Sequence, residues 1–259
     1  MHERRPRLSR SVAALAVAIA LLVAAETGFH QWRAWNVGPV QRGLRTASAR
    51  GCFACHGPGG VTGLPDAGAG IGGVPPFSRE EVRSSARDEA EIREWVLDGA
   101  PRRVREEAAT AEGPAPLLRM PAWRGVLSDR EVSDLVAYVK AVSDFALPPE
   151  GPIDEGRRAA LERGCLSCHG PQGRGNAPNP GSLKGYIPSW DGADFPELAK
   201  DEAEVREWIL DGSPRRLREN PLAMFFLRRQ VLKMPGYRGR LSDDEVARLL
   251  DYIRWLRRG

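Results

Sequence analysis

The sequence has few side chains that bind metals: four cysteines, four histidines and four methionines stand among its 259 residues. It also lacks a large excess of charge. The net charge is +4, and the first ten residues supply +3 of this through four arginines and one glutamate. Because the rest of the chain is nearly neutral, no broad basic surface is left to bind a nucleic acid.

The chain also lacks long apolar runs beyond its N-terminal segment. A hydrophobic fraction of 42 % and a charged fraction of 28 % exclude a mostly disordered chain and a polytopic membrane protein. The 28 glycines and 21 prolines predict that loops outweigh regular structure, and Gly57–Pro76 shows no alternation typical of a strand. The length is sufficient for two domains of ordinary size.

The cysteines follow one pattern. Together with two histidines they form two copies of Cys-x-x-Cys-His, at Cys52, Cys55 and His56 and at Cys165, Cys168 and His169. Two thiols on one side of a helical turn can form thioethers to one porphyrin, and the next histidine can ligate its iron. A redox cysteine pair or a zinc site leaves the histidines unexplained, whereas two disulfides are conceivable in a secreted chain. The pattern predicts two covalently bound c-type haems.

The chain contains an internal duplication. Adding 113 carries the first motif onto the second and Glu94–Gly99 onto Glu207–Gly212. An offset of 114 carries Met120–Gly125 onto Met234–Gly239. Self-similarity over such a length indicates tandem domains. We therefore divide the chain into an N-terminal segment at 1–38, a first domain at 39–147, a linker at 148–152 and a second domain at 153–259.

Each unit is predicted to be mainly helical, which gives an all-α fold. Capping boxes begin at Ser128 and Ser242 and precede apolar residues spaced at i, i+3, i+4 and i+7. A middle helix is expected over 88–98, ending at Gly99, with a twin that ends at Gly212. Trp95 and Trp208 on these helices are expected to be packing residues. Shorter helices at 40–52 and 153–165 are expected to lead into the two motifs.

The histidines, cysteines and methionines outside the two motifs are the candidates for a second axial ligand of each haem iron. Outside the motifs only His2 and His30 remain, both in the N-terminal segment, and no cysteine is spare. Met120 and Met234 lie 64 and 65 residues after the motif histidines, and each follows a basic residue and precedes a proline. Met224 has no counterpart in the first unit and is expected to lie in the core.

We therefore predict His56 with Met120 at the first iron and His169 with Met234 at the second. Methionine favours ferrous iron and raises the reduction potential. With both axial positions filled, neither iron has an open site for a substrate. This predicts an electron carrier rather than an enzyme.

With these elements the sequence resembles class I c-type cytochromes, in two tandem copies over about 39–259. The matching features are the Cys-x-x-Cys-His motif near the start of each unit, the Met-Pro loop and the final amphipathic helix. The resemblance implies the small all-α cytochrome c fold, in which the first and last helices cross and one haem edge stays exposed.

The resemblance also implies that a proline carbonyl accepts a hydrogen bond from each haem-ligating histidine. Pro65 and Pro178 are the candidates, although both also fit ordinary loop prolines. Four arginines are candidates to pair with haem propionates, and they equally fit solvated surface positions: Arg102, Arg103, Arg215 and Arg216.

The N-terminal segment predicts a membrane element. Ser11–Ala25 is uncharged and apolar, and its extension to Phe29 gives a helix of ~28 Å. The preceding arginines suit the cytoplasmic side, and Trp32 and Trp35 suit an aromatic belt. We favour a retained transmembrane anchor, while Val23–Ala25 leaves a cleaved signal peptide open. In either case the expected location of the domains is the bacterial periplasm, because the resemblance implies that haem is attached outside the cytoplasmic membrane.

These features predict a membrane-attached dihaem cytochrome that passes single electrons between redox partner proteins of a respiratory or photosynthetic chain, or that serves within a larger complex. No nucleic acid or small-molecule substrate is expected. The alternative is a dihaem enzyme such as a peroxidase, which needs a vacant or displaceable axial position. The paired Met-Pro elements argue against that alternative.

Overall fold

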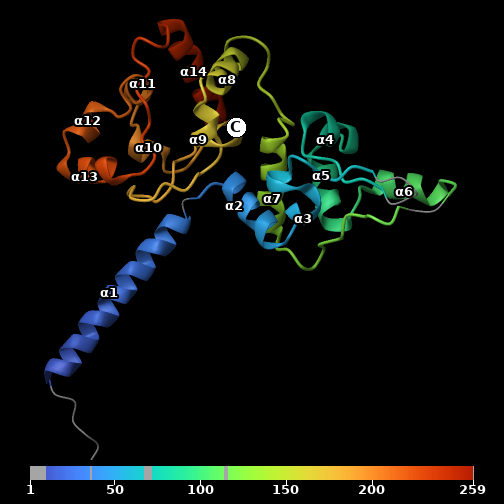
Figure 1. Cartoon of the computed structure of the whole chain (residues 1–259), viewed down its shortest axis with the longest axis horizontal. Helices are drawn as coiled ribbons and strands as arrows, with labels where there is room; N and C mark the ends of the chain where they lie inside the picture. Colours follow the sequence, from blue (N-terminus) through green and yellow to red (C-terminus); the bar gives the residue numbers. More distant parts are fainter. Residues whose placement is uncertain (1–9, 36, 67–71, 114–115, 259) are drawn as a thin grey trace, which may run out of the picture. The chain divides into compact units, whose positions relative to one another are not determined.

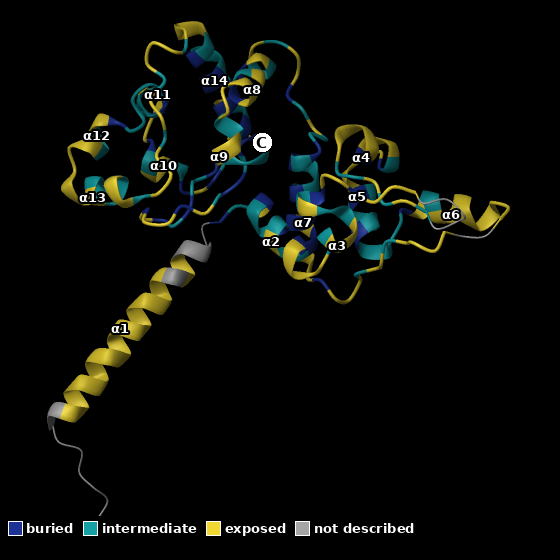
Figure 2. Ribbon diagram, in the orientation of Figure 1, coloured by how far each residue is buried: buried dark blue, intermediate teal, exposed yellow. Residues whose placement is uncertain are grey.

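The computed structural model describes residues 10–35, 37–66, 72–113 and 116–258 (Figure 1). The chain divides into two compact units, residues 1–37 and 38–259. The first unit contains one helix, α1 (Arg10–Trp35). Its window Val12–Phe29 has a mean hydropathy of 2.2, and Figure 2 shows the helix exposed along its described length. By length and composition α1 can cross a membrane, and a signal sequence meets the same criteria.

The regular structure in the described residues of the second unit is helical, apart from two isolated β-bridges, Leu64–Val74 and Pro178–Tyr186. Its first helical domain contains α2 (Pro39–Ala49), α3 (Phe53–His56), η1 (Pro58–Gly60), α4 (Arg79–Ser85), α5 (Glu89–Asp98), α6 (Arg102–Thr110) and α7 (Asp129–Val142). Its second contains α8 (Pro152–Glu162), α9 (Cys165–His169), η2 (Pro171–Gly173), α10 (Phe195–Leu198), α11 (Glu202–Asp211), α12 (Arg215–Arg218), α13 (Pro221–Arg229) and α14 (Asp243–Leu256). The all-α prediction is confirmed.

The helices before the two motifs are shorter than expected. The predicted helices at 40–52 and 153–165 end at Ala49 and Glu162. Gly51 and Gly164 follow these ends, and each has a φ of +75°. This left-handed backbone separates the leading helix from the motif, which forms a short helix of its own.

In each domain the first and last helices pack side by side, α2 against α7 and α8 against α14 (Figure 1). A glycine lies at each crossing: a Cβ on Gly43 would stand 2.0 Å from the Asp134 carbonyl oxygen, and one on Gly156 would stand 2.0 Å from that of Arg248. Val132 on α7 and Val246 on α14 are completely buried. The glycines therefore allow the backbones of the crossing helices to touch above these cores.

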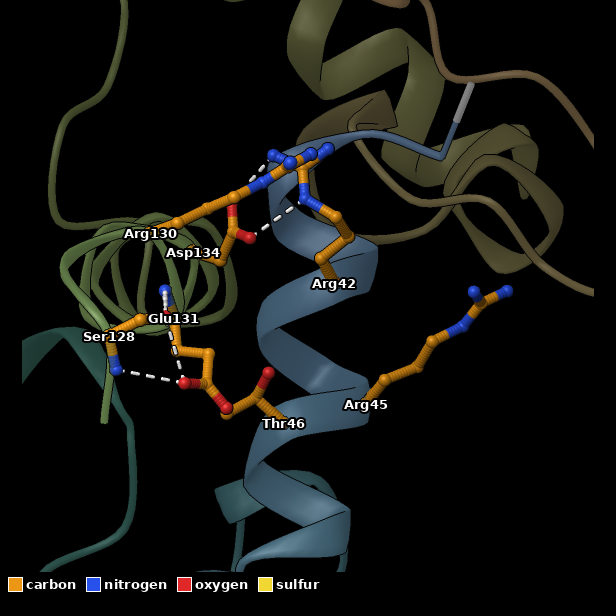
Figure 3. Close-up of a pocket in the computed structure, with 7 residues that line it drawn as sticks. All are labelled: Arg42, Arg45, Thr46, Ser128, Arg130, Glu131 and Asp134. Carbon is orange, nitrogen blue, oxygen red and sulfur yellow. Dashed lines mark hydrogen bonds and ion pairs between the residues drawn. The ribbon is translucent and has the colours of Figure 1, made fainter. Parts of the chain in front are cut away.

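A partly buried ion pair connects the crossing helices in the first domain. Arg42 on α2 donates to both carboxylate oxygens of Asp134 on α7, at 2.7 Å each (Figure 3). The equivalent pair in the second domain has its charges exchanged, because Glu155 on α8 meets Arg248 on α14 at 3.1 Å. The duplication has thus kept the attraction while it exchanged the partners.

We predict that Gly156→Ala destabilises the protein. Alanine favours an isolated helix by ~1 kcal/mol over glycine, but here its methyl group meets a carbonyl, and such overpacking costs about 1–3 kcal/mol of the free energy of unfolding. Denaturant unfolding of the haem-loaded chain measures the change. Ser48→Ala, at an exposed position of α2, is the control and should change it by less than ~0.5 kcal/mol. Equal stability of the two variants would contradict the packing argument.

Capping boxes begin both final helices. Ser128 accepts from the Glu131 N–H while the Glu131 carboxylate accepts from the Ser128 N–H, and Ser242 and Glu245 repeat this arrangement. Arg50, just beyond α2, also bonds to Glu131 at 2.9 Å. The backbone N–H and the arginine lower the pKa of Glu131 from about 4.5 to about 2, and Glu245 is lowered to about 2 in the same way.

This arrangement predicts an acid-sensitive contribution to stability. Because the folded pKa values lie below the unfolded ones, the stabilisation is complete above about pH 4.5 and is lost as the pH falls toward 2. Glu131→Gln and Glu245→Gln should flatten the decline of the urea midpoint between pH 5 and pH 3. If the urea midpoints of the variants fell with pH as steeply as that of wild type over this range, the two glutamates would make no such contribution.

Candidate haem-binding sites

Each Cys-x-x-Cys-His motif forms one helical turn. In α3 the His56 N–H donates to the Cys52 carbonyl at 3.1 Å, and α9 holds the second motif from Cys165 to His169. None of the four cysteines forms a disulfide; Cys52 and Cys165 pack against the domain cores, and Cys55 and Cys168 are exposed. Both thiols of a pair thus lie beside one histidine on a single turn.

A proline carbonyl orients each histidine, but the two prolines differ from those expected. Nδ1 of His56 lies 3.3 Å from the carbonyl oxygen of Pro75, and Nδ1 of His169 lies 3.3 Å from that of Pro188. The choice of Pro65 and Pro178 was therefore wrong. The reason is that bridges fold the loops back: the pairing of Leu64 with Val74 returns the chain to His56 at Pro75, ten residues later than expected.

The carbonyl contact fixes the tautomer of the histidine. A carbonyl only accepts hydrogen bonds, so Nδ1 carries the proton and Nε2 keeps its lone pair for a metal. Burial lowers the pKa of His56 and lowers that of His169 to about 4, and the carbonyl contact offsets this only in part. Both imidazoles are therefore neutral at pH 7, as ligation of iron requires.

The loops that contain Met120 and Met234 pack against the C-terminal ends of α5 and α11. Met120 and Met234 are half-buried and pack against the cores of their domains. Gly99, with a φ of +78°, lies so close to Met120 that a Cβ would stand 2.5 Å from the methionine carbonyl oxygen, and Gly212 makes the same approach to Met234. Any side chain at these glycines would displace the methionine backbone.

An arginine fastens each loop to the same helix end. Arg124 donates to both oxygens of Asp98 at 2.7 and 2.8 Å, and Arg238 donates to both oxygens of Asp211 at 2.8 and 2.9 Å. The arginine and hydrogen bonding hold the pKa of Asp211 below its ordinary value. Both segments are repeated in the two units of the sequence, and the structure shows that they contact each other. The available signal was their nearly equal spacing, since Asp98 and Arg124 lie 26 residues apart and Asp211 and Arg238 lie 27 apart.

The four candidate arginines all meet carboxylates of their own domains. Arg103 binds Glu91 at 3.2 Å and Arg216 binds Glu204 at 2.7 Å, while Arg102 and Arg215 pair with glutamates four residues later. These contacts favour the alternative of surface arginines over propionate ligands.

The other residues considered in the sequence are two tryptophans, Met224 and the two N-terminal histidines. The indole N–H groups of Trp95 and Trp208 donate to the Ser85 and Leu198 carbonyls at 3.0 Å, in keeping with packing roles. Met224 is half-buried on α13. His2 lies outside the described residues, and so does the side chain of His30.

The donors of each domain fit a covalently attached haem. Each domain offers two cysteines outside any disulfide, an imidazole whose Nδ1 is already engaged, and a methionine thioether on a fastened loop. Thiols would hold the porphyrin, and Nε2 of the histidine would bind the iron.

Comparisons with known proteins agree with this chemistry. Residues 153–257 match the family model described as cytochrome c, and residues 38–139 match that described as cytochrome c oxidase, cbb3-type, subunit III. A cytochrome c4 of Thiocapsa roseopersicina is 29 % identical over 240 residues, which cover 89 % of this chain and 99 % of the relative. No solved structure matches significantly. The chain therefore belongs to the c-type cytochromes, as an all-α tandem of two cytochrome c domains that binds two covalent haem c groups.

Proposed function

We propose that this cytochrome carries single electrons between redox partner proteins of a bacterial electron-transport chain, on the periplasmic side of the membrane. The observation that carries the proposal is that each domain contains one oriented histidine and one methionine on a fastened loop. Between residues 38 and 259 the only histidines are His56 and His169. A c4 cytochrome aligned along nearly its whole length supports the same class of function.

Different residues of the chain would orient the histidine ligands, supply the second ligands and hold the ligand loops in place. A bound haem supplies reversible one-electron chemistry at its iron. The carbonyls of Pro75 and Pro188 hold the imidazoles in one tautomer and orientation. We propose Met120 and Met234 as the second ligands. The contacts of Arg124 and Arg238 limit the movement of their loops, which favours a small reorganisation when the charge of the site changes.

We predict that Met120→Ala and Met234→Ala each lower one reduction potential and open one haem to carbon monoxide, because each removes a soft neutral ligand. A spectroscopic redox titration and carbon monoxide binding to the reduced protein measure both effects. Met224→Ala is the matched control and should change neither.

An unchanged titration curve for either of the first two variants would remove that methionine from the ligand set. Rapid stoichiometric binding of carbon monoxide by the unaltered protein would favour a dihaem enzyme instead, since it requires a displaceable axial position.

We also propose that α1 remains as a membrane anchor. It has 26 residues, its apolar window is fully exposed in the structure, and the arginines of the first ten residues fit the cytoplasmic side. A soluble helix of this composition would expose about half a dozen large aliphatic side chains to water, including Leu21 and Leu22.

The anchor predicts that the mature protein keeps its first 35 residues and resists extraction by salt. The intact mass of the haem-loaded protein, and its distribution between washed membranes and supernatant, test this. Leu21→Arg combined with Leu22→Arg should shift the protein toward the supernatant, because each arginine costs ~2.5–3.5 kcal/mol at the centre of a membrane helix. A mature N-terminus at Glu26 would show that the segment is a cleaved signal.

A further inference from the structure

A hydrogen bond from the second helical domain reaches the first. Gln172, in η2, donates from Nε2 to Asp144 Oδ1 at 3.0 Å, and the same nitrogen lies 3.4 Å from the carbonyl of Ala146. Asp144 and Ala146 follow α7, the last helix of the first domain. Arg157 of α8 also approaches Asp144, at 3.9 Å. Two side chains of the second domain thus converge on one carboxylate of the first.

The backbone at both ends of this hydrogen bond is strained. Among the described non-glycine residues, only Asp144 and Gln172 have a positive φ, at 49° and 55°. The residue of the first domain that corresponds to Gln172 is Gly59, with a φ of 63°. Glycine adopts this conformation freely, whereas glutamine is disfavoured there. A glutamine at such a position points to a role for its side chain.

Burial and a backbone hydrogen bond hold Gln172 in place. It is only 8 % exposed, and its carbonyl accepts a hydrogen bond from the buried hydroxyl of Tyr252 on α14 at 3.0 Å. Tyr138 makes the same bond to the Gly59 carbonyl at 2.8 Å. A tyrosine hydroxyl therefore supports the equivalent turn in each domain, but only the turn of the second domain carries a side chain, that of Gln172, at this position.

A second contact between the domains lies four residues further on. Asn176 is 1 % exposed, accepts from the Gly38 N–H at 2.9 Å, and donates from its own N–H to Gln41 Oε1 at 3.2 Å. Gly38 caps α2, the first helix of the first domain. The residue that corresponds to Asn176 in the first domain is Gly63, which has no side chain to make such a contact.

We propose that Gln172 and Asn176 fix the second cytochrome domain against the first, so that the two haems keep one relative orientation. The inference rests on the proposed electron-carrier function, because a constant orientation matters when electrons pass between the haems. A connecting segment alone would leave the domains free to move, which is the usual behaviour of domains without a specific interface. Gln172 lies three residues after His169, so the contact acts close to the second haem.

The test uses the haem-loaded full chain in detergent and the variant Gln172→Gly. This change gives the turn the residue of the first domain and relieves strain, so the variant should fold and keep or raise its melting temperature. Pulsed dipolar electron paramagnetic resonance between the two ferric irons should show a broader distance distribution than in wild type. Amide hydrogen exchange at Gly38 and Asn176 should be roughly tenfold faster, because their hydrogen bonds cross the interface.

Asp144→Asn is the matched control. Asparagine keeps an oxygen that accepts from Gln172 and tolerates a positive φ, so the distance distribution and the exchange rates should match those of wild type. Asn176→Ala should also speed exchange at Gly38, because it removes the acceptor. A Gln172→Gly variant with the distance distribution and exchange rates of wild type would overturn the proposal. Exchange does not depend on the ligands of the iron, so this outcome is separate from a failure of the carrier function.

Discussion

A loop can present a metal ligand in a fixed position only where the rest of the fold holds it, and both proposed methionine ligands are held in the same way. Met120 and Met234 stand in segments without regular structure, and each segment is held at the end of a middle helix by a glycine that touches the methionine backbone and by a bidentate arginine–aspartate pair. Exposed ion pairs alone contribute little. Here they act together with backbone hydrogen bonds, such as those from Tyr237 to Ile209 and from Arg238 to Leu210. The two motifs repeated most clearly in the sequence are therefore the two halves of one contact.

Much of this structure could be predicted because its signals are local. The spacing of Cys52, Cys55 and His56, the capping box at Ser128 and the helix ending at Gly99 each depend on neighbours within a few residues. The prolines that orient the histidines could not be predicted, because isolated bridges between loop residues decide which carbonyl returns to the ring. The short helices α4, α6, α10, α12 and α13 were missed for a related reason: segments of four to nine residues carry too little periodicity to be recognised.

The two domains differ where they meet, and they agree where each folds on its own. The crossing glycines Gly43 and Gly156 are shared, and the ion pair beside them is kept with its charges exchanged. At the turn after the motif, by contrast, Gly59 of the first copy corresponds to Gln172 in the second. Duplication explains the common interior of the domains, and the proposed role of Gln172 at the contact with the first domain accounts for its strained backbone.

The ligands of the two irons are the central claim, and electron paramagnetic resonance of the oxidised, correctly matured protein examines them most directly. We expect two low-spin signals of equal intensity, both typical of histidine–methionine ligation. A high-spin, five-coordinate signal from either iron in the untreated protein would contradict it.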